Sequence, residues 1–417
     1  MMLLFPISSG TYQILNFRNR FWLPKPVSAL IVSGREDNSL AAAQRQNGRS
    51  RPGRRATISD VSNALGLTKS TVSRALNDYP DIAETTRARV KRMAQKLGYR
   101  PLATAQSIRT GRVRAIGFII ELAEHDAHRP FMAEFLAGMS RSASAEGWTL
   151  TVAASSTPEE TLEIISKLQM ESKADGFIIP RTLIDDERIT RLRNDYIPFV
   201  TFGRTNSDEE TVWYDIAGEE AMRSAVLHLH DLGHDRIAFV NGGSKYKYSE
   251  LRREGYIQGL TDAGLDIDHS LIFEECLSEE DGRAAAQSIL AADNPPTAFV
   301  YALDRAALGL YPLAKELDLT IGEHLSVISY DGVPEGAAVE PPLSTYAVDI
   351  ARAGERLGAL LIRHLRDDEA KDLHELEQAT FLDRGSAGAP ALTSAQLSAH
   401  LRGLGPKGAF SNGRNST

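Results

Sequence analysis

Residues 58–77 have the sequence ISDVSNALGLTKSTVSRALN, which predicts two short helices joined by a tight turn. Gly66 is expected to end the first helix, because glycine accepts the left-handed conformation that often follows a helix. Helical spacing predicts that this first helix has one apolar face, formed by Asp60, Val61, Ala64 and Leu65. The stretch therefore predicts a helix–turn–helix unit.

The second helix is expected to begin after Thr68, whose hydroxyl can cap a helix N-terminus. Val72 and Leu76 lie four residues apart and can face one core together. The opposite face keeps short polar or basic side chains: Lys69, Ser70, Ser73, Arg74 and Asn77. Such side chains suit the base edges of a DNA major groove. An ordinary helical hairpin with a solvated face would show the same pattern.

The flanking sequence favours the DNA-binding interpretation. A third helix is expected after Ile82, although Ala83 stands where a Ser or Thr cap would be expected. The next helical segment, after Pro101, is too short to be stable alone in water. Residues 57–117 resemble the headpiece and hinge of the lactose-repressor family of bacterial transcription regulators. The resemblance rests on DVSNALGLTKSTVSRALN, TRARV, LGYRP, SIRTG and AIGF in this order, and continues more loosely to about Gly385.

The resemblance implies how this region meets DNA. It places Ile108 at a position where relatives insert a leucine between base pairs of the minor groove and kink the duplex. Packing within the linker is the alternative for this side chain. The residues predicted to contact DNA are Ile58, Lys69, Ser70, Thr71, Ser73, Arg74, Asn77, Ala105 and Ile108.

The charge distribution is consistent with binding of a polyanion by the N-terminal part of the chain. Residues 1–55 and 56–114 each carry a net charge of +7. Because the whole chain has a net charge of −8, the remainder carries −22. A basic front on an acidic body indicates that the front alone binds nucleic acid.

Beyond residue 114 the pattern changes to buried strands alternating with helices, in two successive sets. This predicts an α/β effector domain of two Rossmann-like lobes beside a small all-α helix–turn–helix headpiece. The resemblance implies the periplasmic sugar-binding-protein fold for this domain. A single strand is expected at 376–382, and Tyr214-Asp215 is expected to open a helix.

The two ends of the chain are harder to interpret. Residues 1–55 are either a disordered basic extension or the product of a start assigned too far upstream. Residues 386–417 are rich in Gly, Ser, Ala and Pro and are predicted to form a disordered tail. The predicted domains are 1–55, the headpiece at 56–100, the hinge helix and linker at 101–113, the effector-binding and dimerisation domain at 114–385, and the tail at 386–417.

Sugar recognition uses carboxylates and arginine to bind hydroxyls over an apolar wall. Open α/β folds bind ligands at the carboxyl ends of strands. By resemblance, Arg252 in RREGY is the cleft arginine and Asp331 the cleft aspartate, while Leu303 replaces a usual asparagine. Helix capping is the alternative for Asp215. The predicted effector-binding residues are Phe131, Met132, Asp215, Arg252, Leu303, Asp304 and Asp331.

Other function classes find little support in the sequence. The single cysteine, Cys276, excludes an internal disulfide, and we expect it to be a core residue in a reducing cytoplasm. The chain lacks the hydrolase, zinc-protease and Walker motifs, so no enzyme, metal site or cofactor is predicted. The chain has no run of eighteen apolar residues, so no membrane partner is predicted.

We therefore expect a cytoplasmic homodimer that binds a palindromic operator in double-stranded DNA. It would repress genes of carbohydrate uptake or catabolism under control of a mono- or disaccharide, because one acid and one base in the cleft cancel. A regulator that responds to purines or another metabolite is one alternative. A transport-type sugar-binding protein is another, but it would need a signal peptide and would not use a basic headpiece.

Overall fold

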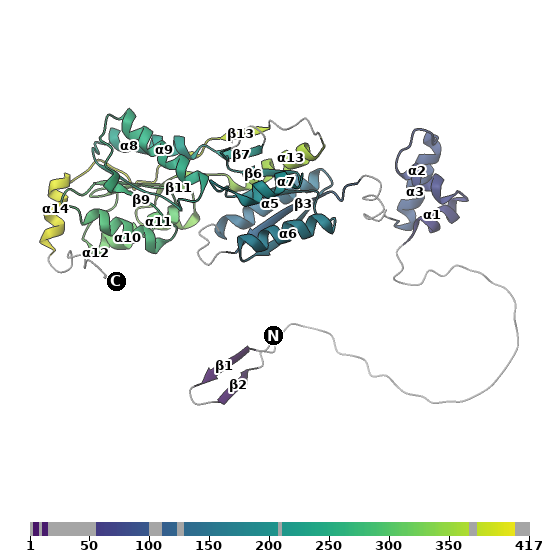
Figure 1. The fold of residues 1–417 in the computed structure, drawn as a ribbon, viewed down its shortest axis with the longest axis horizontal. Coiled ribbons are helices and arrows are strands. Elements are labelled where there is room, and N and C mark those ends of the chain that lie inside the picture. The colour runs from purple at the N-terminus through teal and green to yellow at the C-terminus, as the bar shows by residue number, and fades with distance from the viewer. Residues whose placement is uncertain are drawn as a thin grey trace. The chain divides into compact units, whose positions relative to one another are not determined.

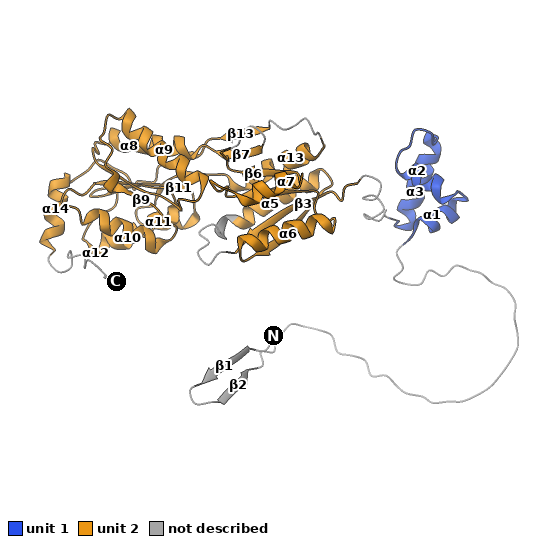
Figure 2. Ribbon diagram, viewed as in Figure 1, with its two compact units in different colours: residues 1–99 blue, residues 100–417 orange. Residues whose placement is uncertain are grey.

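The computed structural model describes residues 3–7, 11–15, 56–99, 111–122, 129–206, 211–366 and 373–404. The chain forms two compact units, residues 1–99 and 100–417 (Figure 2). At the start of the first unit, β1 (Leu3–Ile7) and β2 (Thr11–Leu15) form an antiparallel hairpin, within the segment expected to be disordered. The interpretation of the rest of residues 1–55 stays a prediction.

The headpiece has the three helices expected from the sequence: α1 (Ile58–Leu65), α2 (Lys69–Leu76) and α3 (Glu84–Leu97). Gly66 has a left-handed conformation, φ 66°, and ends α1. The Thr68 hydroxyl accepts a hydrogen bond from the Thr71 amide at 3.1 Å and caps α2. The helix α3 lacks a side-chain cap at Ala83, as the sequence predicted.

The predicted apolar face of α1 is wrong at two residues. The Asp60 carboxylate accepts the Thr57 amide at 2.7 Å and completes a capping box, and Ala64 is exposed. The small core of the headpiece is formed instead by Val61, Val72, Ala75, Val90 and Ala94. Leu65 and Leu76 pack against it, so the predicted core face of α2 is confirmed.

The second unit has two α/β lobes, each built on a six-stranded sheet. Lobe 1 has the strand order β13-β7-β6-β5-β3-β4, with all neighbouring strands parallel. Its strands are β3 (Ala115–Glu121), β4 (Thr149–Ser155), β5 (Gly176–Pro180), β6 (Phe199–Phe202), β7 (Val212–Ile216) and β13 (His374–Glu377). Its helices are α5 (Arg129–Ala145), α6 (Pro158–Met170), α7 (Glu187–Asn194) and α13 (Ile350–Arg366).

Lobe 2 repeats this architecture with the order β14-β12-β11-β10-β8-β9, in which only β14 is antiparallel. Its strands are β8 (Ile237–Val240), β9 (Ile272–Phe273), β10 (Ala298–Tyr301), β11 (Ser326–Asp331), β12 (Ser344–Ala347) and β14 (Thr380–Leu382). Its helices are α8 (Gly218–Asp231), α9 (Lys247–Asp262), α10 (Glu279–Leu290), α11 (Asp304–Ala307), α12 (Leu310–Glu316) and α14 (Ser394–Gly403). Figure 1 shows α8 and α9 on one face of this sheet and α10 and α11 on the other.

The chain passes between the lobes three times: after β7, after β12 and after β13. Two expectations are corrected here. Tyr214 and Asp215 lie inside β7 and do not open a helix. The strand predicted at 376–382 is two short strands in different sheets, because the third passage between lobes lies between Glu377 and Thr380.

The predicted disordered tail is wrong for residues 386–404. Ser386 is buried, and its hydroxyl donates to the Val327 carbonyl at 2.6 Å. Leu397 and Leu401 of α14 belong to the core of lobe 2. The Gly-, Ser- and Pro-rich composition of this segment resembles that of a linker. In the structure, however, Ser386 is hydrogen-bonded to lobe 2 and the leucines of α14 are buried in its core.

Some helices cross with almost no space between their backbones. A Cβ atom at Gly255 of α9 would lie 2.0 Å from the carbonyl oxygen of Glu219 in α8. The crossing of α5 and α13 is as close, since a Cβ at Gly138 would lie 2.0 Å from the Ala351 carbonyl oxygen. Within the described residues, no helix is long and apolar enough to cross a membrane.

Gly255→Ala should lower the free energy of unfolding by about 1–3 kcal/mol, because the added methyl group forces α8 and α9 apart. Gly403→Ala is the matched control, since no atom of the described residues lies within 4 Å of a Cβ at Gly403 in α14. Urea unfolding followed by circular dichroism measures both variants. Equal stability of the two variants would contradict the close crossing.

Candidate DNA-binding face and ligand cavity

The polar face of α2 presents several of the residues predicted to contact DNA. Lys69 and Ser70 at the start of α2 are exposed. Arg74, in the last turn, forms an ion pair with Asp81 and lies 5.2 Å from the centre of the Tyr79 ring. These contacts extend Arg74 along the surface of the headpiece, whereas Lys69 and Ser70 make no side-chain hydrogen bond within the described residues.

The remaining predicted DNA contacts have mixed environments. Ile58 packs against the headpiece core, so only part of its side chain is accessible. The Thr71 hydroxyl lies 2.9 Å from that of Thr68, and the Asn77 amide donates to the Ser73 carbonyl at 2.7 Å. Ala105 and Ile108 lie outside the described residues, so the proposed wedge in the minor groove stays a prediction.

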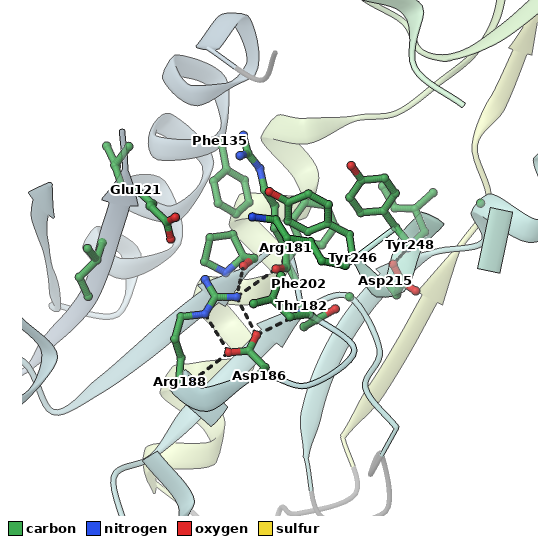
Figure 3. Close-up of a pocket in the computed structure, with 18 of the residues that line it drawn as sticks. Glu121, Phe135, Arg181, Thr182, Asp186, Arg188, Phe202, Asp215, Tyr246 and Tyr248 are labelled. Atoms are coloured by element: carbon green, nitrogen blue, oxygen red, sulfur yellow. Dashed lines mark hydrogen bonds and ion pairs between the residues drawn. The ribbon is translucent and has the colours of Figure 1, made fainter. Parts of the chain in front are cut away.

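A cavity of about 490 Å³ is lined by residues of both lobes. Lobe 1 contributes the ends of β3, β5, β6 and β7 together with Met132 and Phe135 of α5. Lobe 2 contributes the start of α8, the loop before α9, the first half of α9 and the end of β11. Figure 3 shows aromatic and charged side chains around this space that come from strands, helices and loops. Its volume falls in the range of about 300–1,000 Å³ that is usual for small-molecule sites.

Arg252 lies in the wall of this cavity between two aromatic rings. Its guanidinium carbon is 3.9 Å from the centre of the Tyr330 ring and 4.7 Å from that of Tyr248. Nη1 donates to the Ala302 carbonyl at 2.6 Å. Among the described residues, neither the buried Nε atom nor the buried hydroxyl of Tyr248 has a hydrogen-bond partner. Nε packs against Gly218 and the Tyr248 hydroxyl against Gly242, so both atoms lie within the wall.

Asp331 ends β11 in an unusual backbone conformation, with φ 128°. Such values cost a residue with a side chain about 1–3 kcal/mol and often mark functional sites. Burial raises the pKa of Asp331 to about 8, although Arg252 opposes the shift. The structure thus places Asp331 and Arg252 in one wall of the same cavity.

Asp215 also lines the cavity, but its carboxylate is already bonded. Oδ2 accepts from Nε of Arg204 at 2.8 Å, and Oδ1 accepts from the Ile216 amide at 2.8 Å. Burial raises the pKa of Asp215, and the Arg204 guanidinium opposes this rise. The helix-capping alternative for Asp215 is excluded, because α8 begins at Gly218 without a side-chain cap.

Two residues predicted to bind the effector do not line the cavity. Leu303 is buried in the core of lobe 2. Asp304 is completely buried, and its Oδ2 accepts the amides of Gly332 and Val333, each at 2.8 Å. Asp304 therefore binds the chain itself. Met132 lines the cavity, whereas the side chain of Phe131 lies outside the described part of the structure.

Several charged and aromatic residues of the cavity were not predicted from the sequence. They include Glu121, Arg181, Asp186, Arg188, Glu219, Tyr246 and Tyr248. The buried Asp186 binds Nε of Arg188 at 2.9 Å and Nη2 at 2.7 Å, and also caps α7 (Figure 3). Glu121 and Arg181 follow the rule that ligands bind at carboxyl ends of strands, because they end β3 and follow β5. That rule was the available signal.

The described residues contain no group of three or more His, Cys, Asp or Glu side chains that could hold a metal ion. Cys276 is buried as predicted, and burial raises the pKa of its thiol. The side chains that line the cavity supply carboxyl groups, guanidinium groups and aromatic rings.

Comparison with known proteins assigns the family. Residues 57–101 match the model of bacterial regulatory proteins of the lacI family, and residues 226–387 match a periplasmic binding protein-like domain. The HTH-type transcriptional regulator AglR of Rhizobium meliloti (strain 1021) is 32% identical over 340 residues, which is 79% of this chain and 94% of AglR. The chain belongs to the LacI family of bacterial regulatory proteins.

Solved structures of LacI-type regulators share the fold. The lac repressor dimer bound to operator and the anti-inducer ONPF has a TM-score of 0.66 at 23% identity, covering 81% of this chain and 100% of that chain. A complex of the transcriptional regulator CelR with cellobiose has a TM-score of 0.62 at 23% identity, covering 80% and 100%. This LacI-family chain is a DNA-binding transcriptional regulator and not an enzyme.

The buried carboxyl of Asp331 should make the stability of this LacI-family regulator depend on pH. An aspartate of the unfolded chain loses its proton near the ordinary aspartate pKa of 3.8, but Asp331 in the folded chain keeps its proton until about pH 8. The folded state therefore binds more protons between these values. As pH rises from 3.8 to about 8, the free energy of unfolding should fall, by at most about 1.4 kcal/mol per pH unit from this group.

Asp331→Asn removes this titration while keeping the shape of the side chain. As pH rises through this range, the free energy of unfolding of the wild type should fall relative to that of the variant. Chemical denaturation at a series of pH values measures it. Parallel curves for the two proteins would contradict the raised pKa.

Proposed function

We propose that this chain is a repressor of carbohydrate uptake or catabolism genes and that a mono- or disaccharide in the cavity controls its binding to DNA. The observation that carries this proposal is the position of Arg252, held between two tyrosine rings beside Asp331 in a cavity of about 490 Å³. A guanidinium and carboxyl groups can make paired hydrogen bonds to neighbouring hydroxyls. Aromatic rings such as Tyr246 and Phe202 offer the apolar wall that a pyranose needs.

The polar groups of the cavity support a neutral ligand. Arg188 is matched by Asp186, and Arg204 by Asp215 and Glu219, so several charges are already compensated within the chain. Arg252, Asp331 and Tyr246 line the same cavity and carry groups that can form hydrogen bonds to hydroxyls. The cellobiose bound by CelR agrees with a disaccharide. A purine is the second candidate, because Tyr246 and Tyr248 are stacked 5.2 Å apart and could also pack against a planar base.

The proposed mechanism places the protein in the cytoplasm as a homodimer. Two headpieces would then bind the two halves of a palindromic operator, and the lac repressor dimer bound to operator is the precedent for this arrangement. Effector binding would change the relation between the lobes and alter DNA affinity by a coupling free energy, commonly about 1–3 kcal/mol.

The effector class can be tested with panels of sugars and of purines. A sugar should raise the melting temperature of the wild-type protein, and calorimetry should show loss of its binding in Asp331→Ala, since an unpaired buried partner costs about 1–3 kcal/mol. Asp185→Ala is the control, because Asp185 is an exposed acid in the same lining. Binding of purines but no sugar would reject the carbohydrate proposal, and unchanged sugar affinity in Asp331→Ala would reject the site.

The DNA-reading role of α2 can be tested without knowing the operator. Lys69→Ala and Ser70→Ala should each change the sequence preferred in a selection from random duplexes, with about 1–3 kcal/mol of discrimination lost for each good base contact. Lys96→Ala, at an exposed lysine of α3, is the control for loss of charge. If Lys69→Ala weakened binding equally for every sequence, Lys69 would be a phosphate contact and its proposed role would be wrong.

A further inference from the structure

The cavity of this regulator contains an ion-pair cluster that joins elements of both lobes. Arg204 follows β6 in lobe 1, Asp215 lies in β7 immediately before the first passage between lobes, and Glu219 lies in the first turn of α8 in lobe 2. Arg204 donates from Nε to Asp215 at 2.8 Å and from Nη2 to both carboxylate oxygens of Glu219 at 2.7 and 2.8 Å. One guanidinium therefore bonds to both sides of the passage.

The backbone holds Arg204 firmly on the side of lobe 1. The Thr182 hydroxyl donates to the Arg204 carbonyl at 2.7 Å. The preceding Gly203 has φ 111°, and its amide donates to the Tyr214 carbonyl at 2.9 Å. A Cβ at Gly203 would lie 2.7 Å from Oγ1 of Thr182, so a residue with a side chain would disturb this arrangement. Arg204 is thus held by the loop after β5 and by β7, and its guanidinium lies beside Glu219.

Glu219 is fixed just as firmly to lobe 2. Its carbonyl oxygen lies at the close crossing of α8 and α9, against Gly255. The aliphatic part of Arg252 packs at the same place, since a Cβ at Gly218 would lie 3.2 Å from Cγ of Arg252. Glu219 and Arg252 therefore both lie at the crossing of α8 and α9 in lobe 2.

The charges make the cluster depend on Arg204. The side chains of Arg204, Asp215 and Glu219 are all less than one-third exposed, so water screens them only partly. Without the guanidinium, two carboxylates would face each other in the cavity wall, and like charges at short range repel. The contact that holds the acids together therefore also links the two lobes, beside the backbone hydrogen bonds between residues 182–184 and 245–247.

We propose that Arg204 is a positioning residue that clamps lobe 1 to lobe 2 across the cavity through Asp215 and Glu219. Both carboxylates line the cavity. A ligand that hydrogen-bonds to either of them acts directly on the contact between the lobes. The clamp is formed by residues of the chain alone, so its definition does not depend on which effector the cavity binds.

The clamp can be tested by measuring the distance between lobes in the full-length protein. Spin labels are placed at Met170→Cys in lobe 1 and Ala292→Cys in lobe 2, both at exposed positions, in a Cys276→Ala background. Labelled chains are diluted with unlabelled chains, so that double electron–electron resonance reports distances within one chain. Wild type should give a narrow distribution, whereas Arg204→Gln and Glu219→Gln should give broader, shifted ones. Arg204→Lys should restore part of the wild-type distribution.

Arg223→Gln is the matched control. Arg223 of α8 donates from Nε to Asp262 of α9 at 2.5 Å, and both residues belong to lobe 2. This variant should keep the wild-type distance distribution even if its melting temperature falls. A wild-type distribution in folded Glu219→Gln would overturn the proposal, as would equal broadening in Arg223→Gln. If Arg204→Gln fails to fold, the more conservative Glu219→Gln decides the question alone.

Discussion

The hydrogen bonds of the buried Asp304 carboxylate connect the parts of lobe 2 on which the cavity depends. Asp304 begins α11 just after β10, and its oxygens accept the amides of Gly332 and Val333 after β11 and the Thr345 hydroxyl of β12. The carboxyl ends of β10 and β11 are thereby joined to Thr345 near the start of β12. The positive φ of Asp331 is possible because the next two amides are held in place. The strand β12, which leads to the second passage between lobes, is held by the same carboxylate through Thr345.

The same interaction explains why sequence reasoning placed Asp304 in the wrong role. An acid at the carboxyl end of a buried strand has the same sequence signature whether it faces a ligand or the neighbouring loops. Periodicity gives the end of the strand but not the direction of the carboxylate. Asp331 and Arg252, which the resemblance to the lactose-repressor family had placed in the cleft, do line the cavity.

The fold itself could largely be predicted from the sequence. The capping residues of the headpiece and the alternation of apolar strands with helices are local signals, and the structure confirms most of them. Contacts between distant segments were not accessible in this way. Arg204 gave no signal, since its partners Asp215 and Glu219 belong to later elements. The ordered structure of residues 386–404 was not predicted, because Ser386, Leu397 and Leu401 are buried against parts of lobe 2 that lie far away in the sequence.

The three passages between lobes also determine when each part of the chain can fold during synthesis. The headpiece contains all its core residues between positions 58 and 99 and is complete early. Lobe 1 waits for α13 and β13, and lobe 2 waits for β14 and α14, which end at Gly403. Domains generally fold as units while the ribosome extends the chain. A message interrupted after residue 99 but before residue 374 would therefore yield a folded DNA-binding headpiece without a complete effector domain, which is a DNA-binding fragment outside metabolic control.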